Sequence, residues 1–257
     1  MLPRIIGLGK KQTMNRNDTV SPQETHPFWK SLLYHLLPGV PVLVFYLWMA
    51  PVLLTRGFPA AFTLCLAIPL VLIPIQLGVL LTYGFRKNRR ISLKGVLCYQ
   101  DKGTFKDYLI YSTVIVLWSG IVFGLLQKTL AAFLQEHVFS FLPDWMLRNA
   151  FEGSRPVLTV TVILVMVFGN ILGPLTEELY FRGFLLPRIR GSSGKKAILN
   201  AFLFALYHFW SPWDLVVRTI AVLPVAYVAV KKRNLYLGMT AHIVLNVLSS
   251  LSLFALL

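Results

Sequence analysis

The stretch VLTVTVILVMVFGNILGPLTEELYFRGF, residues 157–184, places charged side chains directly after a long apolar run. Residues 157–172 are almost all hydrophobic, which predicts a membrane-spanning helix. Two adjacent carboxylates, Glu177 and Glu178, follow the run, and Arg182 lies four positions after the second. A carboxylate next to hydrocarbon costs several kcal/mol unless it is paired, hydrated or protonated. The stretch therefore indicates a membrane protein with a polar site inside it.

The composition of the whole chain agrees with a membrane protein. Of the 257 residues, 56% are hydrophobic and only 14% are charged, whereas soluble domains carry about 25% charged residues. The net charge of +15 comes from short basic clusters between apolar runs, with no basic face interleaved with aromatic residues, so we expect no nucleic-acid partner. Cys65 lies in an apolar run and Cys98 in a basic loop, so neither a disulfide nor a thiolate metal site is expected.

Seven apolar segments predict an all-α, polytopic transmembrane bundle, because each approaches the roughly 20 residues that cross about 30 Å of hydrocarbon. They are residues 31–54, 60–84, 108–126, 157–175, 197–210, 215–230 and 235–257. The fifth and sixth are short, so we expect these helices to begin or end in the headgroup layer. Residues 1–30 are predicted to be a polar cytoplasmic tail without a signal peptide, and residues 31–257 a single transmembrane domain.

The basic residues fall in alternate connections between the predicted spans. One set of connections holds most of them: Arg4, Lys10, Lys11, Arg16 and Lys30; Arg86, Lys87, Arg89, Arg90, Lys94, Lys102 and Lys106; Arg188, Arg190, Lys195 and Lys196; and Lys231, Lys232 and Arg233. The other set holds Arg56, Lys128, Arg148 and Arg155. By the positive-inside rule, the N-terminus is expected in the cytoplasm and the C-terminus outside.

Several polar residues of the second half lie at one predicted depth. Counted from the basic ends of their helices, Glu177, His208 and His242 lie about 10–17 Å below the cytoplasmic surface at 1.5 Å per residue. Glu178 and Arg182 are neighbours at i,i+4 and are expected to pair, whereas Glu177 points about a third of a turn away, into the bundle.

A proline and an asparagine precede the two glutamates on the same predicted helix. Pro174 leaves the carbonyl of Asn170 without its usual helical donor, so we expect a bend that admits water near Glu177.

Taken singly, each of these residues has a structural explanation. A lone membrane histidine is more often a helix–helix hydrogen-bond partner, and the glutamates with Arg182 can be a structural pair. Arg218 follows Asp214 by four residues near a predicted outer end, which favours a snorkelling salt bridge. The combination of Glu177, His208, His242 and Asn246 favours one shared site instead.

The residue types in this set suit hydrolysis of an amide. The chain contains no H-E-x-x-H motif, no pair of intramembrane aspartates and no convincing serine nucleophile motif. A carboxylate and a histidine can activate water, and a second histidine and a carboxamide can donate hydrogen bonds to the oxyanion.

Three motifs carry a resemblance to a known family. EELYFR (residues 177–182), FALYH (204–208) and HIVLN (242–246) resemble the E-E-x-x-x-R, F-x-x-x-H and H-x-x-x-N motifs of the CPBP intramembrane proteases. This family includes the eukaryotic type II CAAX prenyl endopeptidase and bacterial Abi and bacteriocin-processing relatives. The resemblance covers residues 157–250 approximately, which we take as the catalytic core.

The resemblance also implies roles for individual residues. It implies that Glu177 and His208 activate the attacking water, that His242 and Asn246 stabilise the oxyanion, and that Glu178 and Arg182 hold the site together. The family has also been described as metal-dependent, and Glu177, His208 and His242 are the three ligands that zinc would use, with a fourth position open. The metal-free version is preferred because Asn246 has a role in it.

The sequence therefore predicts an intramembrane endopeptidase, expected in a bacterial plasma membrane with a cavity open to the cytoplasm. Its partners would be the lipid bilayer and a peptide or membrane-anchored protein, either a CAAX-type tail or a leader or signalling peptide. An alternative is a non-proteolytic immunity or scaffold protein that binds through the cavity or through the amphipathic segment 133–151. A proton-coupled transporter is disfavoured because the sequence shows no inverted repeat.

Overall fold

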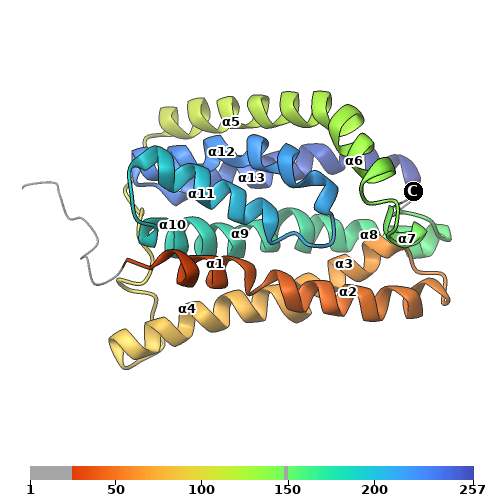
Figure 1. The fold of residues 1–257 in the computed structure, drawn as a ribbon, viewed down its shortest axis with the longest axis horizontal. Helices are drawn as coiled ribbons and strands as arrows, with labels where there is room; N and C mark the ends of the chain where they lie inside the picture. Colours follow the sequence, from red (N-terminus) through yellow and green to blue (C-terminus); the bar gives the residue numbers. More distant parts are fainter. Residues whose placement is uncertain (1–24, 148–149) are drawn as a thin grey trace, which may run out of the picture.

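The structure is a computed structural model that describes residues 25–147 and 150–257 (Figure 1). Every regular element in these residues is a helix, apart from one isolated β-bridge between Gln100 and Asn234, which confirms the predicted all-α fold. The α-helices are α1 Phe28–Leu36, α2 Gly39–Leu54, α3 Ala60–Ala67, α4 Ile73–Asn88, α5 Phe105–Leu126, α6 Ala132–His137, α7 Asp144–Leu147, α8 Arg155–Leu164, α9 Gly173–Glu177, α10 Leu186–Arg188, α11 Ser193–Leu206, α12 Leu215–Lys232 and α13 Leu235–Ser250.

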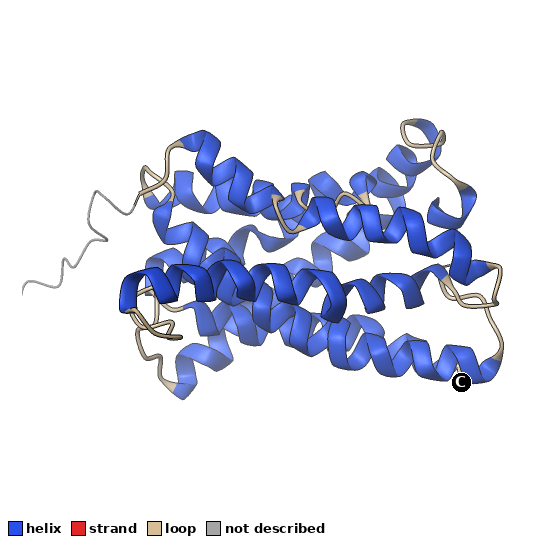
Figure 2. Cartoon of the chain, turned by 90° about the horizontal axis from the view of Figure 1, so that it is seen from below, coloured by secondary structure: helices blue, strands red, loops and turns tan. Residues whose placement is uncertain are grey.

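The helices run alongside one another as an elongated bundle (Figures 1 and 2). Six helical segments of the described residues are long and apolar enough to cross a membrane: Phe28–Leu54, Ala60–Asn88, Phe105–His137, Arg155–Arg188, Pro212–Lys232 and Leu235–Leu256. The fifth predicted span corresponds to α11, whose 14 residues extend only about 21 Å at the usual helical rise. It packs mainly along α12. The count of seven spans and the orientation stay predictions.

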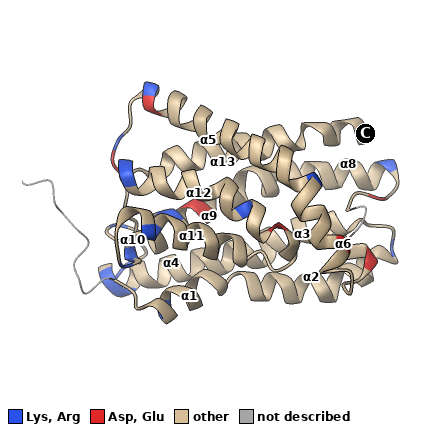
Figure 3. Cartoon of the chain, turned by 45° about the horizontal axis from the view of Figure 1, so that its top comes forward, with Lys and Arg blue, Asp and Glu red and all other residues tan. Residues whose placement is uncertain are grey.

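The predicted basic loops meet at one end of the bundle. Arg188 Nη2 donates to the carbonyl of Val96 (3.1 Å), and Lys232 pairs with Asp107 (3.4 Å). Figure 3 shows lysines and arginines gathered at this end, around α10 and the start of α11. Shared placement of these loops agrees with the predicted alternation of basic residues.

Part of the predicted tail packs against this end. The backbone N–H of His26 donates to the carbonyl of Arg188 (2.8 Å), and His26 is buried. The remainder of the predicted tail, with Arg4, Lys10, Lys11 and Arg16, lies outside the described residues, as does Arg148.

Two π-helical segments, Val165–Leu172 and Glu178–Leu185, flank α9 on the same long helix. Proline lacks a backbone N–H, so each proline here removes one helical hydrogen bond and frees a carbonyl. The carbonyl of Gly183, four residues before Pro187, accepts from the N–H of Cys98 (2.8 Å). Widened turns of this kind are frequent at functional sites, and this pair brackets Glu177.

Candidate active site

A cavity of about 300 Å³ is lined mainly by residues of the second half of the chain, together with Ile68, Leu72 and Phe123. Its walls include Glu177 from α9, His208 just after α11, and His242 and Asn246 from α13. The four predicted catalytic residues, which come from three separate helical regions, therefore line one cavity. Their chemical roles stay predictions.

Glu177 is held by a tyrosine that the sequence analysis did not single out. The hydroxyl of Tyr207 donates to Oε1 of Glu177, and both side chains are buried. The second oxygen, Oε2, lies 3.8 Å from Nε2 of His242. Tyr207 directly precedes His208 in the FALYH motif, so its position next to a predicted catalytic residue was the available signal.

Glu178 forms the predicted pair with Arg182 and also binds His242. Its Oε1 lies 3.3 Å from Nη1 of Arg182 and 3.0 Å from Nδ1 of His242. A carboxylate can only accept, so Nδ1 of His242 carries the hydrogen and Nε2 is left facing Glu177. The Arg182 guanidinium also lies over the ring of Phe204, 4.0 Å from its centroid. Glu178 thus fixes the orientation of the His242 ring.

His208 takes its orientation from the end of α11. Its backbone N–H donates to the carbonyl of Ala205, and its Nδ1 donates to the carbonyl of Phe204 (2.8 Å). This is a helix-end carbonyl that has lost its usual donor. Because a carbonyl only accepts, Nδ1 carries the hydrogen and Nε2 is an acceptor with no hydrogen-bond partner among the described residues. His208 therefore offers a free basic nitrogen at the cavity.

Asn246 donates to a backbone carbonyl of the π-helical segment Val165–Leu172, which precedes Pro174. In the π-helical segment, the N–H of Gly173 donates five residues back, to Phe168. By the same spacing the carbonyl of Gly169 would need a donor from Pro174, which has none, and Nδ2 of Asn246 donates to it instead (3.2 Å). The α-helical spacing predicted the freed carbonyl at Asn170, whereas the π-helical spacing places it at Gly169. The second amide hydrogen of Asn246 is left for another acceptor.

The zinc-dependent alternative depends on how closely Glu177, His208 and His242 are grouped. Within residues 25–147 and 150–257, no three His, Cys, Asp or Glu residues are grouped so that they could hold one. Glu177, His208 and His242 are thus not arranged as a ligand set, and the role of zinc stays a question for experiment.

Arg218 also lines this cavity. Its predicted ion pair with Asp214 is present, with Nη2 3.2 Å from Oδ2. The sequence analysis placed this pair at the outer membrane boundary and did not connect it with the site.

Comparison with known proteins adds one finding. Residues 158–248 match the family model described as Type II CAAX prenyl endopeptidase Rce1-like. The match confirms the resemblance to the CPBP proteases over this segment, which contains all six predicted site residues. No curated protein and no solved structure matches the chain. The six membrane-length segments support a multi-pass membrane protein, and the family model that matches residues 158–248 describes endopeptidases.

Proposed function

We propose, from this match and the geometry of the cavity, that the chain is an intramembrane endopeptidase that uses Glu177 and His208 to activate water. The observation that carries the proposal is the shared cavity of Glu177, His208, His242 and Asn246. Water attacks the carbonyl carbon of the substrate amide while one of its protons passes to the carboxylate of Glu177. That proton then goes to the leaving nitrogen, so the products are a carboxylate and an amine.

His242 and Asn246 would stabilise the oxyanion. The free amide hydrogen of Asn246 is one donor, and Nε2 of His242, when it carries a hydrogen, is the other. Glu178 and Arg182 act through His242, because the contact of Glu178 with Nδ1 sets the direction of Nε2. Tyr207 acts in the same way on Glu177 by holding Oε1.

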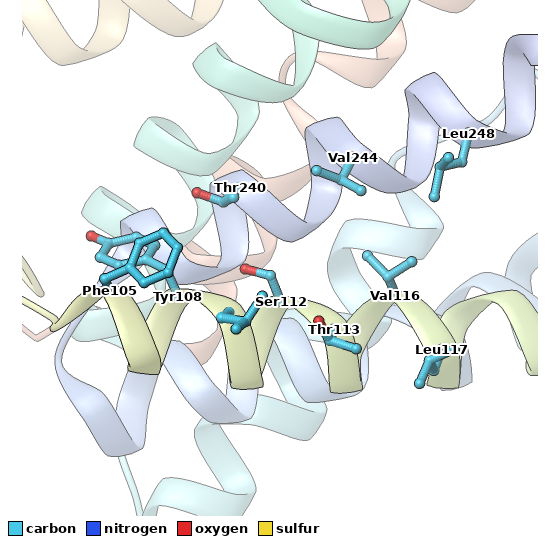
Figure 4. A pocket seen from close by; sticks show the side chains of 10 residues that line it. Phe105, Tyr108, Ser112, Thr113, Val116, Leu117, Thr240, Val244 and Leu248 are labelled. Carbon is cyan, nitrogen blue, oxygen red and sulfur yellow. The ribbon is translucent and has the colours of Figure 1, made fainter.

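An apolar groove between α5 and α13 suggests that the substrate carries a lipid chain. A cavity of about 780 Å³ between these helices shares Phe123, Leu245 and Asn246 with the candidate active site. It continues into a further cavity of about 440 Å³ (Figure 4). The residues shared by these two cavities are Val116, Leu117 and Leu248.

A hydrocarbon chain in this groove would bring an attached peptide to Asn246. We therefore propose a lipid-linked, CAAX-type peptide as the substrate. The proposed enzyme resides in a bacterial plasma membrane with its site open to the cytoplasm.

Cleavage of a peptide library by the purified full chain tests this function. We expect cleavage that a strong chelator does not change, and faster cleavage of a prenylated peptide than of the same peptide without the lipid. Failure to cut any member of the library would favour a non-proteolytic membrane protein. Loss of activity on chelation, restored by zinc, would favour the metal-dependent alternative.

Removal of either oxyanion donor should slow the reaction strongly. We expect Asn246→Ala and His242→Ala each to lose about 2.7–4 kcal/mol of transition-state stabilisation, which is the usual size for one donor. Steady-state kinetics on the best library peptide measures this loss. Tyr236→Phe, at an exposed position of the same helix that lines none of these cavities, serves as the control. Unchanged kinetics of purified Asn246→Ala would contradict its assigned role.

A further inference from the structure

Arg218 combines a charged group, a place at the candidate active site and an incomplete set of hydrogen bonds. It lies in the first turn of α12, and its side chain is 16% exposed. Both of its hydrogen bonds use Nη2, which donates to Oδ2 of Asp214 (3.2 Å) and to Oγ of Ser211 (3.0 Å). Nη1 is buried and has no hydrogen-bond partner within the described part of the chain. A planar guanidinium that can bind a carboxylate through two nitrogens is thus used here through one.

The ion pair with Asp214 does not account for the position of Arg218 at the cavity. Asp214 is also held from another side, because Nε2 of Gln127 donates to its Oδ1 (2.9 Å). Asp214 is not among the residues that line the cavity, whereas Arg218 is. Of the two residues in this ion pair, the one that lines the cavity is therefore the positively charged Arg218.

The charges on the cavity wall indicate what Arg218 would bind. Glu177 and Arg218 are the acidic and basic residues among the described side chains that line it, and the other polar groups are histidines and Asn246. A second anion beside Glu177 is unfavourable in a medium of low dielectric unless a cation offsets the repulsion. Arginine stays protonated at all relevant pH values and is suited to carboxylates.

We propose that Arg218 binds a carboxylate of the peptide substrate and thereby selects which bond is cut. This inference rests on the proposed peptidase function. The carboxylate is either the free C-terminus of the substrate or an acidic side chain close to the cut bond. A cavity of about 300 Å³ is at the small end of the range for ligand sites, so the cut bond lies within a short segment of the bound carboxylate.

The test uses one cleavable peptide sequence in three forms. The first form has a free C-terminal carboxylate, the second a C-terminal carboxamide, and the third a carboxamide plus one glutamate near the cut bond. The kcat/KM of each form is measured with the full chain as wild type, Arg218→Gln, Arg218→Lys and Arg155→Gln. Arg155 is an exposed arginine at the start of α8 and serves as the matched control.

The wild-type protein should prefer one carboxylate form over the plain carboxamide by about 10- to 150-fold, which corresponds to a charge-assisted hydrogen bond of 1.5–3 kcal/mol. Which form is preferred identifies the source of the carboxylate. Arg218→Gln should bring the ratio close to one, Arg218→Lys should give an intermediate ratio, and Arg155→Gln should keep the wild-type ratio. Equal cleavage of the three forms by the wild type, or an unchanged ratio in Arg218→Gln, would overturn the proposal while the peptidase function stands.

Two further measurements keep the outcome decisive. If Arg218→Gln does not fold because Asp214 is left unpaired, the double variant Asp214→Asn/Arg218→Gln removes both charges and is measured in its place. If no form is cleaved, the peptidase function is wrong, and binding of the labelled peptides to the wild-type chain then tests Arg218 alone. Equal affinity for the carboxylate and carboxamide forms would overturn the proposed carboxylate site, and tighter binding of a carboxylate form would support it.

Discussion

Replacement of Glu177 with glutamine is expected to lower kcat by about 10²–10⁴-fold, which is the usual contribution of a general base. Glutamine has nearly the same shape as glutamate, and its amide oxygen can still accept the hydrogen bond that Tyr207 donates to Oε1. What it loses is the ability to take a proton from water. The variant should therefore fold normally and bind substrate while its turnover is lost.

Turnover of the best library peptide and thermal unfolding in detergent measure the two parts of this prediction. Glu136→Gln is the matched control, because Glu136 is an exposed glutamate of α6 that does not line the cavity. Wild-type turnover in the Glu177→Gln protein would rule out the assigned role of Glu177. A large fall in its melting temperature would show that the carboxylate is needed for folding instead.

Much of the candidate site follows from the sequence, because helix geometry relates spacing to position. A rise of 1.5 Å and a rotation of 100° per residue are enough to separate Glu177 from Glu178 and to pair Glu178 with Arg182. The same arithmetic, counted from the basic loops, brings His208 and His242 to the level of Glu177. The structure contains that pair, at 3.3 Å, and places these residues at one cavity.

Other features depend on where helices end and on how far they are wound, which hydrophobicity does not reveal. Residues 197–210 are apolar like the neighbouring spans, yet α11 ends at Leu206. Directly after this end, Tyr207 donates to Glu177 and His208 lines the cavity. The π-helical turns shift the free carbonyl from Asn170 to Gly169. Arg218 lines the cavity because of the way α12 packs against α11. The four-residue spacing between Asp214 and Arg218 predicts their ion pair but not this packing.

Replacement of Arg182 with methionine is expected to destabilise the fold by about 3–5 kcal/mol, the range for removal of one partner from a buried ion pair. Arg182 and Glu178 are both fully buried. Without the guanidinium, His242 is left as the hydrogen-bond partner of the Glu178 carboxylate among the described residues, where its other oxygen, Oε2, has no partner. Methionine keeps an unbranched apolar side chain but loses the charge and its contact with the Phe204 ring.

Unfolding of the purified chain in detergent measures this loss, with Arg56→Met, an exposed arginine, as the control. The double variant Glu178→Gln/Arg182→Met should regain part of the stability, because it leaves no buried charge without its partner. It should not regain activity, because a neutral amide holds Nδ1 of His242 less firmly than a carboxylate does. Wild-type stability of Arg182→Met would contradict the structural role of the pair. Recovery of both stability and turnover in the double variant would show that Glu178 does not position His242.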